Sequence, residues 1–243
     1  MFNNRSTPED KSHYTDSAPD YPFFGRDIWT SIFVATTLMI VTIIGILIFA
    51  DTIFAHAVLW LYSAWAFLGV VVIGAGITIG RWIGIKGMSG ERYRLAVVGS
   101  LISVFTYSVF GGAVITPYNP DLYIPAIVIT GGITILITII AAIYVFRTDR
   151  NLQFIARYSG ASFMVGLVAI LFGTFVQPLL ILGFALFLLG FLLDLVYEIW
   201  MITDGNRTPI ANGFGLYIAF AGVFVHILQL VLRYGLQILS HQN

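Results

Sequence analysis

The chain has 243 residues, of which 58% are hydrophobic and only 10% are charged, and its mean hydropathy is +0.92. A soluble domain carries about 25% charged residues, so 12 basic and 12 acidic side chains are too few to cover a soluble surface of this size. The balanced charge excludes a nucleic-acid-binding protein, which would show a basic excess. The absence of cysteine excludes disulfides, thiolate metal sites and a cysteine nucleophile. This composition predicts a multi-pass integral membrane protein whose surroundings are the lipid bilayer.

Seven stretches are long and apolar enough to cross the hydrocarbon core as helices, which takes about 20 residues each. They are continuously apolar and not alternating, which excludes a transmembrane β-barrel. We therefore predict an all-α membrane domain over residues 28–239, between a disordered cytoplasmic tail (1–27) and a short external tail (240–243). In chain order the stretches are Ile28–Ala50, Ala57–Gly80, Leu95–Thr116, Leu122–Phe146, Tyr158–Val176, Leu179–Met201 and Gly213–Leu239.

The basic residues predict the orientation of the chain. All but Arg233 precede the first stretch or lie in alternate connections, and the connections on the opposite side contain no Lys or Arg. The positive-inside rule then places the N-terminus in the cytoplasm and the C-terminus outside, and we expect the membrane to be the plasma membrane. The residues on this basic side are Arg5, Lys11, Arg26, Arg81, Lys86, Arg92, Arg94, Arg147, Arg150, Arg157 and Arg207.

The connections are too short to hold a soluble catalytic domain, so any function must reside among the helices. Ionisable groups inside the membrane are costly and are therefore candidates for function. Asp194 and Glu198 are four residues apart in the sixth stretch, so both carboxylates project from one helix face. Two such acids in low dielectric resist ionising together unless a cation sits between them. This arrangement indicates a proton-sensitive gate or a cation site, unless the helix ends early and both acids face water.

The seventh stretch contributes two further candidate proton-sensing or ion-binding groups. His226 lies in its middle, where it can titrate or hydrogen-bond a helix carbonyl. Arg233 lies near the outer end, where its guanidinium either snorkels to the interface or pairs with an acid. Together with Gln229 these residues give the helix one polar face, which favours a central position in the bundle.

We predict no enzyme, no cofactor and no resident metal. Gly160-Ala161-Ser162 followed by His226 resembles an intramembrane serine protease dyad, but Phe163 replaces the glycine expected after the serine. No His-Glu-x-x-His cluster is present for a metalloprotease. The seventh stretch has no lysine for a retinal Schiff base.

Several segments of the second half are similar to the transmembrane Bax inhibitor motif family. The run Tyr144–Arg150 resembles that family's junction of aromatic, threonine, basic and aspartate residues, and the sixth stretch closes on Phe191-Leu192-Leu193-Asp194 as the family's does. The Leu216-Tyr217 pair and the ending at Arg233 look like the family's final helix. The resemblance covers about residues 95–235.

This resemblance implies two three-helix layers around a central seventh helix. Bacterial members of the family are proton-sensitive calcium leak channels, so calcium or protons become candidate partners, and eukaryotic members protect cells against stress-induced death. The family's gate is a pair of aspartates, one on each of the last two helices. Asp194 matches the first, whereas the place of the second falls on Ala219 or Val223, and Glu198 becomes a candidate substitute on the same helix. A non-transporting membrane scaffold or stress regulator remains the first alternative function and the intramembrane serine protease ranks below it. The oligomeric state stays open.

Overall fold

The computed structural model describes residues 25–90, 92–148, 150–205 and 207–235, and within these ranges it is entirely helical. The predicted tail segments 1–24 and 240–243 lie outside the described residues. The helices are α1 (Arg26–Phe49), α2 (Ile53–Ala64), α3 (Ala66–Ser89), α4 (Tyr93–Ile115), α5 (Tyr123–Phe146), α6 (Gln153–Gly173), α7 (Gln177–Asp204) and α8 (Pro209–Leu230). A single 3-10 turn (Pro120–Leu122) precedes α5, and a π turn (Val231–Gly235) continues α8.

Seven of these helices are long and apolar enough to cross a membrane, which confirms the predicted all-α multi-pass fold. The second predicted span, Ala57–Gly80, is wrong in its bounds. The chain instead forms the short helix α2 and then breaks at Trp65, whose φ of −151° and ψ of 75° are not helical. The sequence has neither glycine nor proline at this break, so the apolar pattern conceals it. As a result, α3 starts later and extends to Ser89, and Arg81 and Lys86 lie inside a helix.

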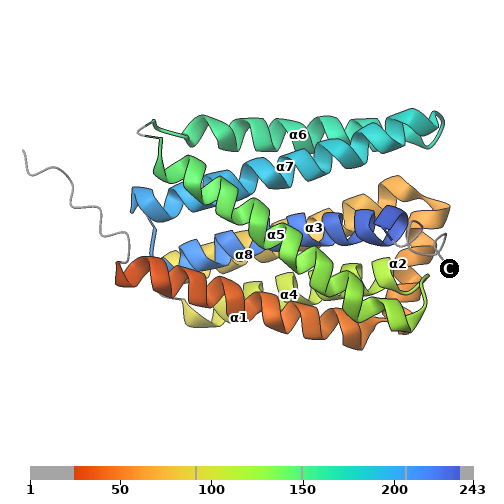
Figure 1. Cartoon of the computed structure of the whole chain (residues 1–243), viewed down its shortest axis with the longest axis horizontal. Coiled ribbons are helices and arrows are strands. Elements are labelled where there is room, and N and C mark those ends of the chain that lie inside the picture. The colour runs from red at the N-terminus through yellow and green to blue at the C-terminus, as the bar shows by residue number, and fades with distance from the viewer. Residues whose placement is uncertain (1–24, 91, 149, 206, 236–243) are drawn as a thin grey trace, which may run out of the picture.

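The helices form two layers with α8 between them (Figure 1). In the first layer α4 packs between α1 and α3, and in the second layer α7 packs between α5 and α6. Helix α8 contacts α1, α3, α4, α5 and α7, and its membrane-spanning window is 72% buried, more than that of any other span. The structure therefore confirms the predicted central last helix flanked by two three-helix layers.

Close packing within the first layer depends on small residues, as is usual where helices meet in lipid. At Gly99 of α4, an added Cβ would overlap the backbone of Gly84 on α3. Lipid-facing glycines differ, since a Cβ at Gly132 of α5 would meet no atom within 4 Å.

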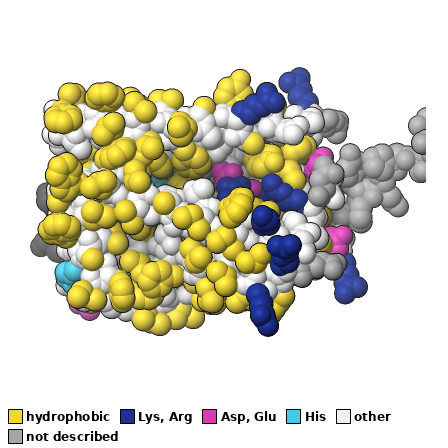
Figure 2. All heavy atoms as spheres, turned by 180° about the vertical axis from the view of Figure 1, so that it is seen from behind, with side chains coloured by type: hydrophobic (Ala, Val, Ile, Leu, Met, Phe, Trp, Pro, Cys, Tyr) yellow, Lys and Arg dark blue, Asp and Glu magenta, His cyan; other side chains and the backbone are white. Residues whose placement is uncertain are grey.

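The outer surface of the bundle is apolar over most of its length, and the charges gather at one end (Figure 2). We call this the basic end. It is formed by the start of α1, the end of α3, the start of α4, the end of α5, the start of α6 and the loop between α7 and α8. Its cations in the described residues are Arg26, Lys86, Arg92, Arg94, Arg147, Arg150, Arg157 and Arg207.

The contrast between Gly99, which is in close contact with α3, and Gly132, which faces lipid, predicts the outcome of two matched substitutions. Gly99→Leu forces a side chain into the backbone of α3, which costs about 1–3 kcal/mol or more. Gly132→Leu adds an apolar side chain to a lipid-facing site and should leave the melting temperature in detergent nearly unchanged. Thermal unfolding and the yield of monodisperse protein test both. Equal melting temperatures for the two variants would contradict the close α3–α4 contact.

Candidate functional site

A cluster of four charged side chains joins the two layers, and we call it the charge cluster. Its members are Arg81 on α3, Asp194 and Glu198 on α7, and Arg207 in the loop that follows α7. The two acids are buried, whereas the side chains of Arg81 and Arg207 are 26% and 21% exposed. At about 1.5 Å per residue, Arg81 lies about 12 Å and Asp194 about 15 Å from the basic ends of their helices, so this ion pair lies within the membrane-spanning part of the bundle.

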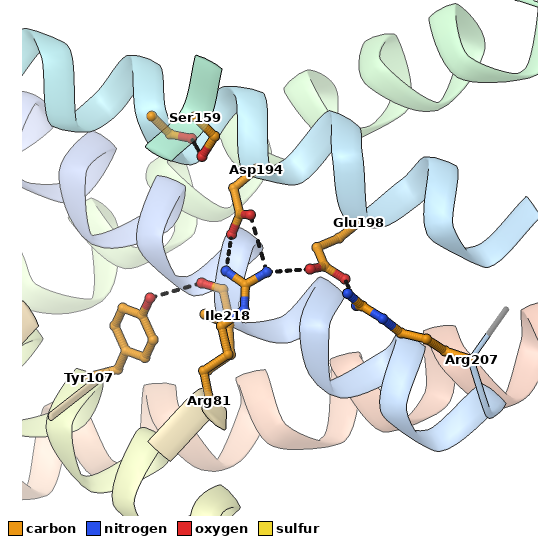
Figure 3. A network of polar contacts seen from close by, with 8 residues as sticks. Arg81, Tyr107, Ser159, Asp194, Glu198, Arg207 and Ile218 are labelled. Atoms are coloured by element: carbon orange, nitrogen blue, oxygen red, sulfur yellow. Dashed lines mark hydrogen bonds and ion pairs between the residues drawn. The ribbon is translucent and has the colours of Figure 1, made fainter. Parts of the chain in front are cut away.

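The Arg81 guanidinium holds both carboxylates of α7 (Figure 3). Its Nη1 donates to Asp194 Oδ2 at 2.6 Å and its Nη2 to Asp194 Oδ1 at 3.2 Å, so this pair is bidentate. Nη2 also donates to Glu198 Oε1. Helices α3 and α7 have little backbone contact, so this side chain rather than helix packing joins them.

Arg207 completes the cluster from the basic end. Its Nη1 donates to Glu198 Oε2 at 3.0 Å, so both oxygens of a fully buried carboxylate accept from a guanidinium. Gly205, in the left-handed conformation with φ of 70°, ends α7 and turns the chain toward Arg207. Two arginines and two acids leave the cluster without net formal charge, which is the condition for burying ions at tolerable cost.

Neighbouring helices shape the space around these charges. Gly215 of α8 faces Glu198, and an added Cβ there would overlap the carboxylate. The Tyr107 hydroxyl on α4 donates to the carbonyl of Ile218 at 2.9 Å, which fixes α4 to the central helix beside the cluster. On the other side, the Ser159 hydroxyl of α6 donates to the Gly190 carbonyl at 3.0 Å (Figure 3).

The structure brings together the two acids singled out from the sequence. The side chains of Asp194 and Glu198 are 7% and 0% exposed, so the interpretation that they face water is wrong, because α7 continues to Asp204. The cation expected between them is present as Arg81. Sequence reasoning placed Arg81 in a loop on the basic side, and this placement is wrong because α3 extends eight residues beyond it to Ser89.

The other two candidates lie apart from the cluster. The Nδ1 of His226 is 2.8 Å from the Gly222 carbonyl of its own helix, and its ring packs 5.1 Å from that of Phe191. Arg233 is exposed, and its guanidinium lies 5.7 Å from the ring centre of Tyr234. Among the described residues, no ion pair joins Arg233 to an acid and no hydrogen bond joins Ser162 to His226.

The chain matches no protein-family model, no curated protein and no solved structure. Within the described parts of the chain, no group of three or more His, Asp or Glu side chains is placed to hold a metal ion. The charge cluster is therefore the feature of the molecule from which its function is inferred.

The cluster predicts a specific non-additivity in stability. Arg81→Met leaves the two acids of α7 with only Arg207, and breaking a buried ion pair in this way costs about 3–5 kcal/mol. Adding Asp194→Asn restores the balance of charge, so Arg81→Met/Asp194→Asn should be more stable than Arg81→Met alone. Thermal unfolding of the wild type, the two single variants and the double variant in one detergent gives the coupling energy. Additive losses would contradict a direct interaction between the two side chains.

Proposed function

We propose that this multi-pass membrane protein is a proton-sensitive cation leak channel, of the type that the transmembrane Bax inhibitor motif family contains. The observation that supports this proposal is the charge cluster, because Arg81 spans the gap between two helix layers at a depth where charge is costly. A protein with a purely structural role avoids this cost when an apolar side chain stands at that position. Buried ion pairs also stabilise a fold less than well-packed apolar side chains do.

In this arrangement the cluster closes the path between the layers. The guanidinium occupies the space between α3 and α7, and its two partners are already neutralised, so a passing cation finds neither room nor free negative charge. Opening requires α3 and α7 to separate and the ion pairs to break. The cost of that separation sets the resting leak.

Protonation lowers this cost. When Asp194 binds a proton it loses its negative charge and with it the bidentate pair to Arg81, which then retains only Glu198 as an ionic partner. Glu198 also accepts from Arg207, so its charge is shared between two guanidinium groups. Among the described residues, the ion pairs of this region bring Asp194 only the guanidinium of Arg81 from α3, with Glu198 beside it on its own helix. The Tyr107 hydroxyl on α4 is engaged by the carbonyl of Ile218. Acidification should therefore favour separation of the layers and increase cation flux.

This gate differs from the aspartate pair of the family. Both acids stand on α7, and the facing positions of α8, Ala219 and Val223, are fully buried apolar residues. A guanidinium from α3 bridges the acids in place of a proton shared between two helices. The proposal therefore assigns proton sensing to the Arg81–Asp194 pair and assigns to Glu198 the modulation of its strength.

We further propose that the basic end is cytoplasmic, in the orientation expected from the positive-inside rule. Pro178 and Arg207 lie at opposite ends of α7, so reporter fusions at these two residues should be active on opposite sides of the membrane. The fusion at Arg207 should respond as a cytoplasmic one. Equal responses at both positions would contradict the seven-span topology, and exchanged responses would reverse the orientation.

Calcium flux into liposomes containing the purified protein tests the channel. Flux should rise by about tenfold or more between a neutral buffer and one acidic enough to protonate a carboxylate, a factor that corresponds to about 1.4 kcal/mol. Asp194→Asn mimics the protonated acid and should raise flux in neutral buffer and flatten the pH profile. Glu198→Gln should shift the profile without removing it.

Asp121→Asn is the matched control, because it removes one acid at the end of the bundle opposite the basic end, outside the cluster. Its pH profile should equal that of the wild type. If Asp194→Asn keeps the wild-type profile, the carboxylate gate is wrong. If the wild type conducts no more than empty liposomes at any pH, the channel is wrong and the protein is better described as a membrane scaffold.

A further inference from the structure

A narrow cavity lies between the two layers, on the side of the charge cluster away from the basic end. Helix α3 packs closely along α4 but only lightly against α6, and the cavity occupies the space that this leaves. Its volume is about 40 Å³, and about 420 Å³ when the open space at its mouth is included. Residues from six helices line it, among them Ile73, Gly74 and Ile77 of α3, and Phe187 and Phe191 of α7.

The cavity is apolar and lies within the hydrocarbon part of the bundle. Along α3 its lining begins at Ile77, about 18 Å from the basic end of that helix, and continues toward the opposite side. At Gly74 the space is open, since an added Cβ would meet no atom within 4 Å. The lining residues Gly74, Phe184 and Phe187 are half-buried, so part of each reaches the outer surface of the bundle. The cavity is thus open toward the surface that contacts lipid.

We infer that the acyl chain of a bilayer lipid enters between α3 and the α6–α7 pair and lies in this cavity. The lining is apolar except for Tyr62, Tyr107 and His226. The Tyr107 hydroxyl and the His226 Nδ1 are already hydrogen-bonded to the carbonyls of Ile218 and Gly222, so few polar partners are left for ordered water, which needs several. Leaving it empty forfeits the dispersion contacts of its walls. At this depth the surrounding solvent is hydrocarbon, and a flexible chain of methylene groups fits a narrow cavity that opens sideways. The lipid comes from the leaflet opposite the basic end.

The inner end of the cavity adjoins the charge cluster. Ile77 precedes Arg81 by four residues and Phe191 precedes Asp194 by three, so each lies one helical turn from a member of the ion pair. An acyl chain in the cavity keeps water from reaching that pair from this side. The binding of the lipid does not depend on the proposed function, and its test measures labelling and not flux.

Photolabelling in phosphatidylcholine vesicles tests the inference. The vesicles contain a small fraction of phosphatidylcholine with a diazirine in the distal half of one acyl chain, and labelled residues are mapped by proteolysis and mass spectrometry. Lipid-facing residues such as Val72 and Leu189, which is 44% exposed, should be labelled in any case. The inference requires that cavity-lining residues hidden from that surface are labelled too, namely Ile73 and Phe191, each 8% exposed.

Gly74→Leu provides the decisive variant, because Gly74 lines the cavity and an added Cβ there meets no atom within 4 Å, so the leucine side chain has room to enter the cavity. It should reduce labelling of Ile73 and Phe191 by about fivefold or more while labelling of Val72 and Leu189 persists. Gly132→Leu is the matched control, since it also adds a leucine at a glycine with open space, on a different helix. It should leave the whole pattern unchanged.

Two outcomes would overturn the inference. They are labelling confined to lipid-facing residues, and equal labelling of Phe191 in the wild type and Gly74→Leu. If Gly74→Leu fails to fold, the wild-type map alone decides between labelled and unlabelled walls. A protein that conducts no cations but labels at Phe191 would refute the proposed function and leave this inference standing.

Discussion

A charge that lies inside a bilayer must be neutralised by the protein that contains it, and this constraint determines how the two helix layers of this protein are joined. The guanidinium of Arg81 lies about 12 Å inside its helix and takes its partners from α7. The two carboxylates in turn need a second cation, which the loop after α7 supplies through Arg207. One costly residue thus fixes the relative positions of α3, α7 and the α7–α8 connection. In hydrocarbon, where apolar packing between helices gains little over contact with lipid, such polar contacts decide specificity.

The central helix extends the same principle with neutral groups. Tyr217 of α8 shares a hydrogen bond of 2.8 Å with Thr42 of α1, and Tyr107 of α4 donates to the α8 backbone at Ile218. These bonds attach α8 to the first layer. Few polar contacts cross from α8 to the second layer, where the bulky ring of Phe191 packs against Gly222 and His226. The second layer is therefore joined to α8 and the first layer mainly by the packing of apolar side chains and by the charge cluster.

Sequence reasoning predicted the spans, the central last helix and the two acids of α7, because hydropathy and the spacing of residues within one helix are local properties. It did not predict the role of Arg81. The positive-inside rule treats an arginine about 12 Å inside the basic end of a helix in the same way as an arginine in the following loop, because both belong to the basic side of the membrane. Its partner Asp194 is 113 residues away in the chain, and no local pattern reveals such a pairing. The sequence does not reveal the break at Trp65, beyond which α3 begins, because neither a glycine nor a proline marks it.

The same separation of 113 residues has a consequence for biosynthesis. At about 5–20 residues per second, roughly 6–23 s pass between the synthesis of Arg81 and that of Asp194. Throughout that interval α3 is present without its counter-charge, and Arg81 must extend toward the headgroups of the nearer leaflet. The first layer is consequently assembled with an unsatisfied cation, and the arrival of α7 supplies the acids that draw this side chain inward. The order of synthesis thus places the electrostatic union of the two layers late in the assembly of the protein, and Arg207, which follows α7 in the chain, is the last of the four charges to be made.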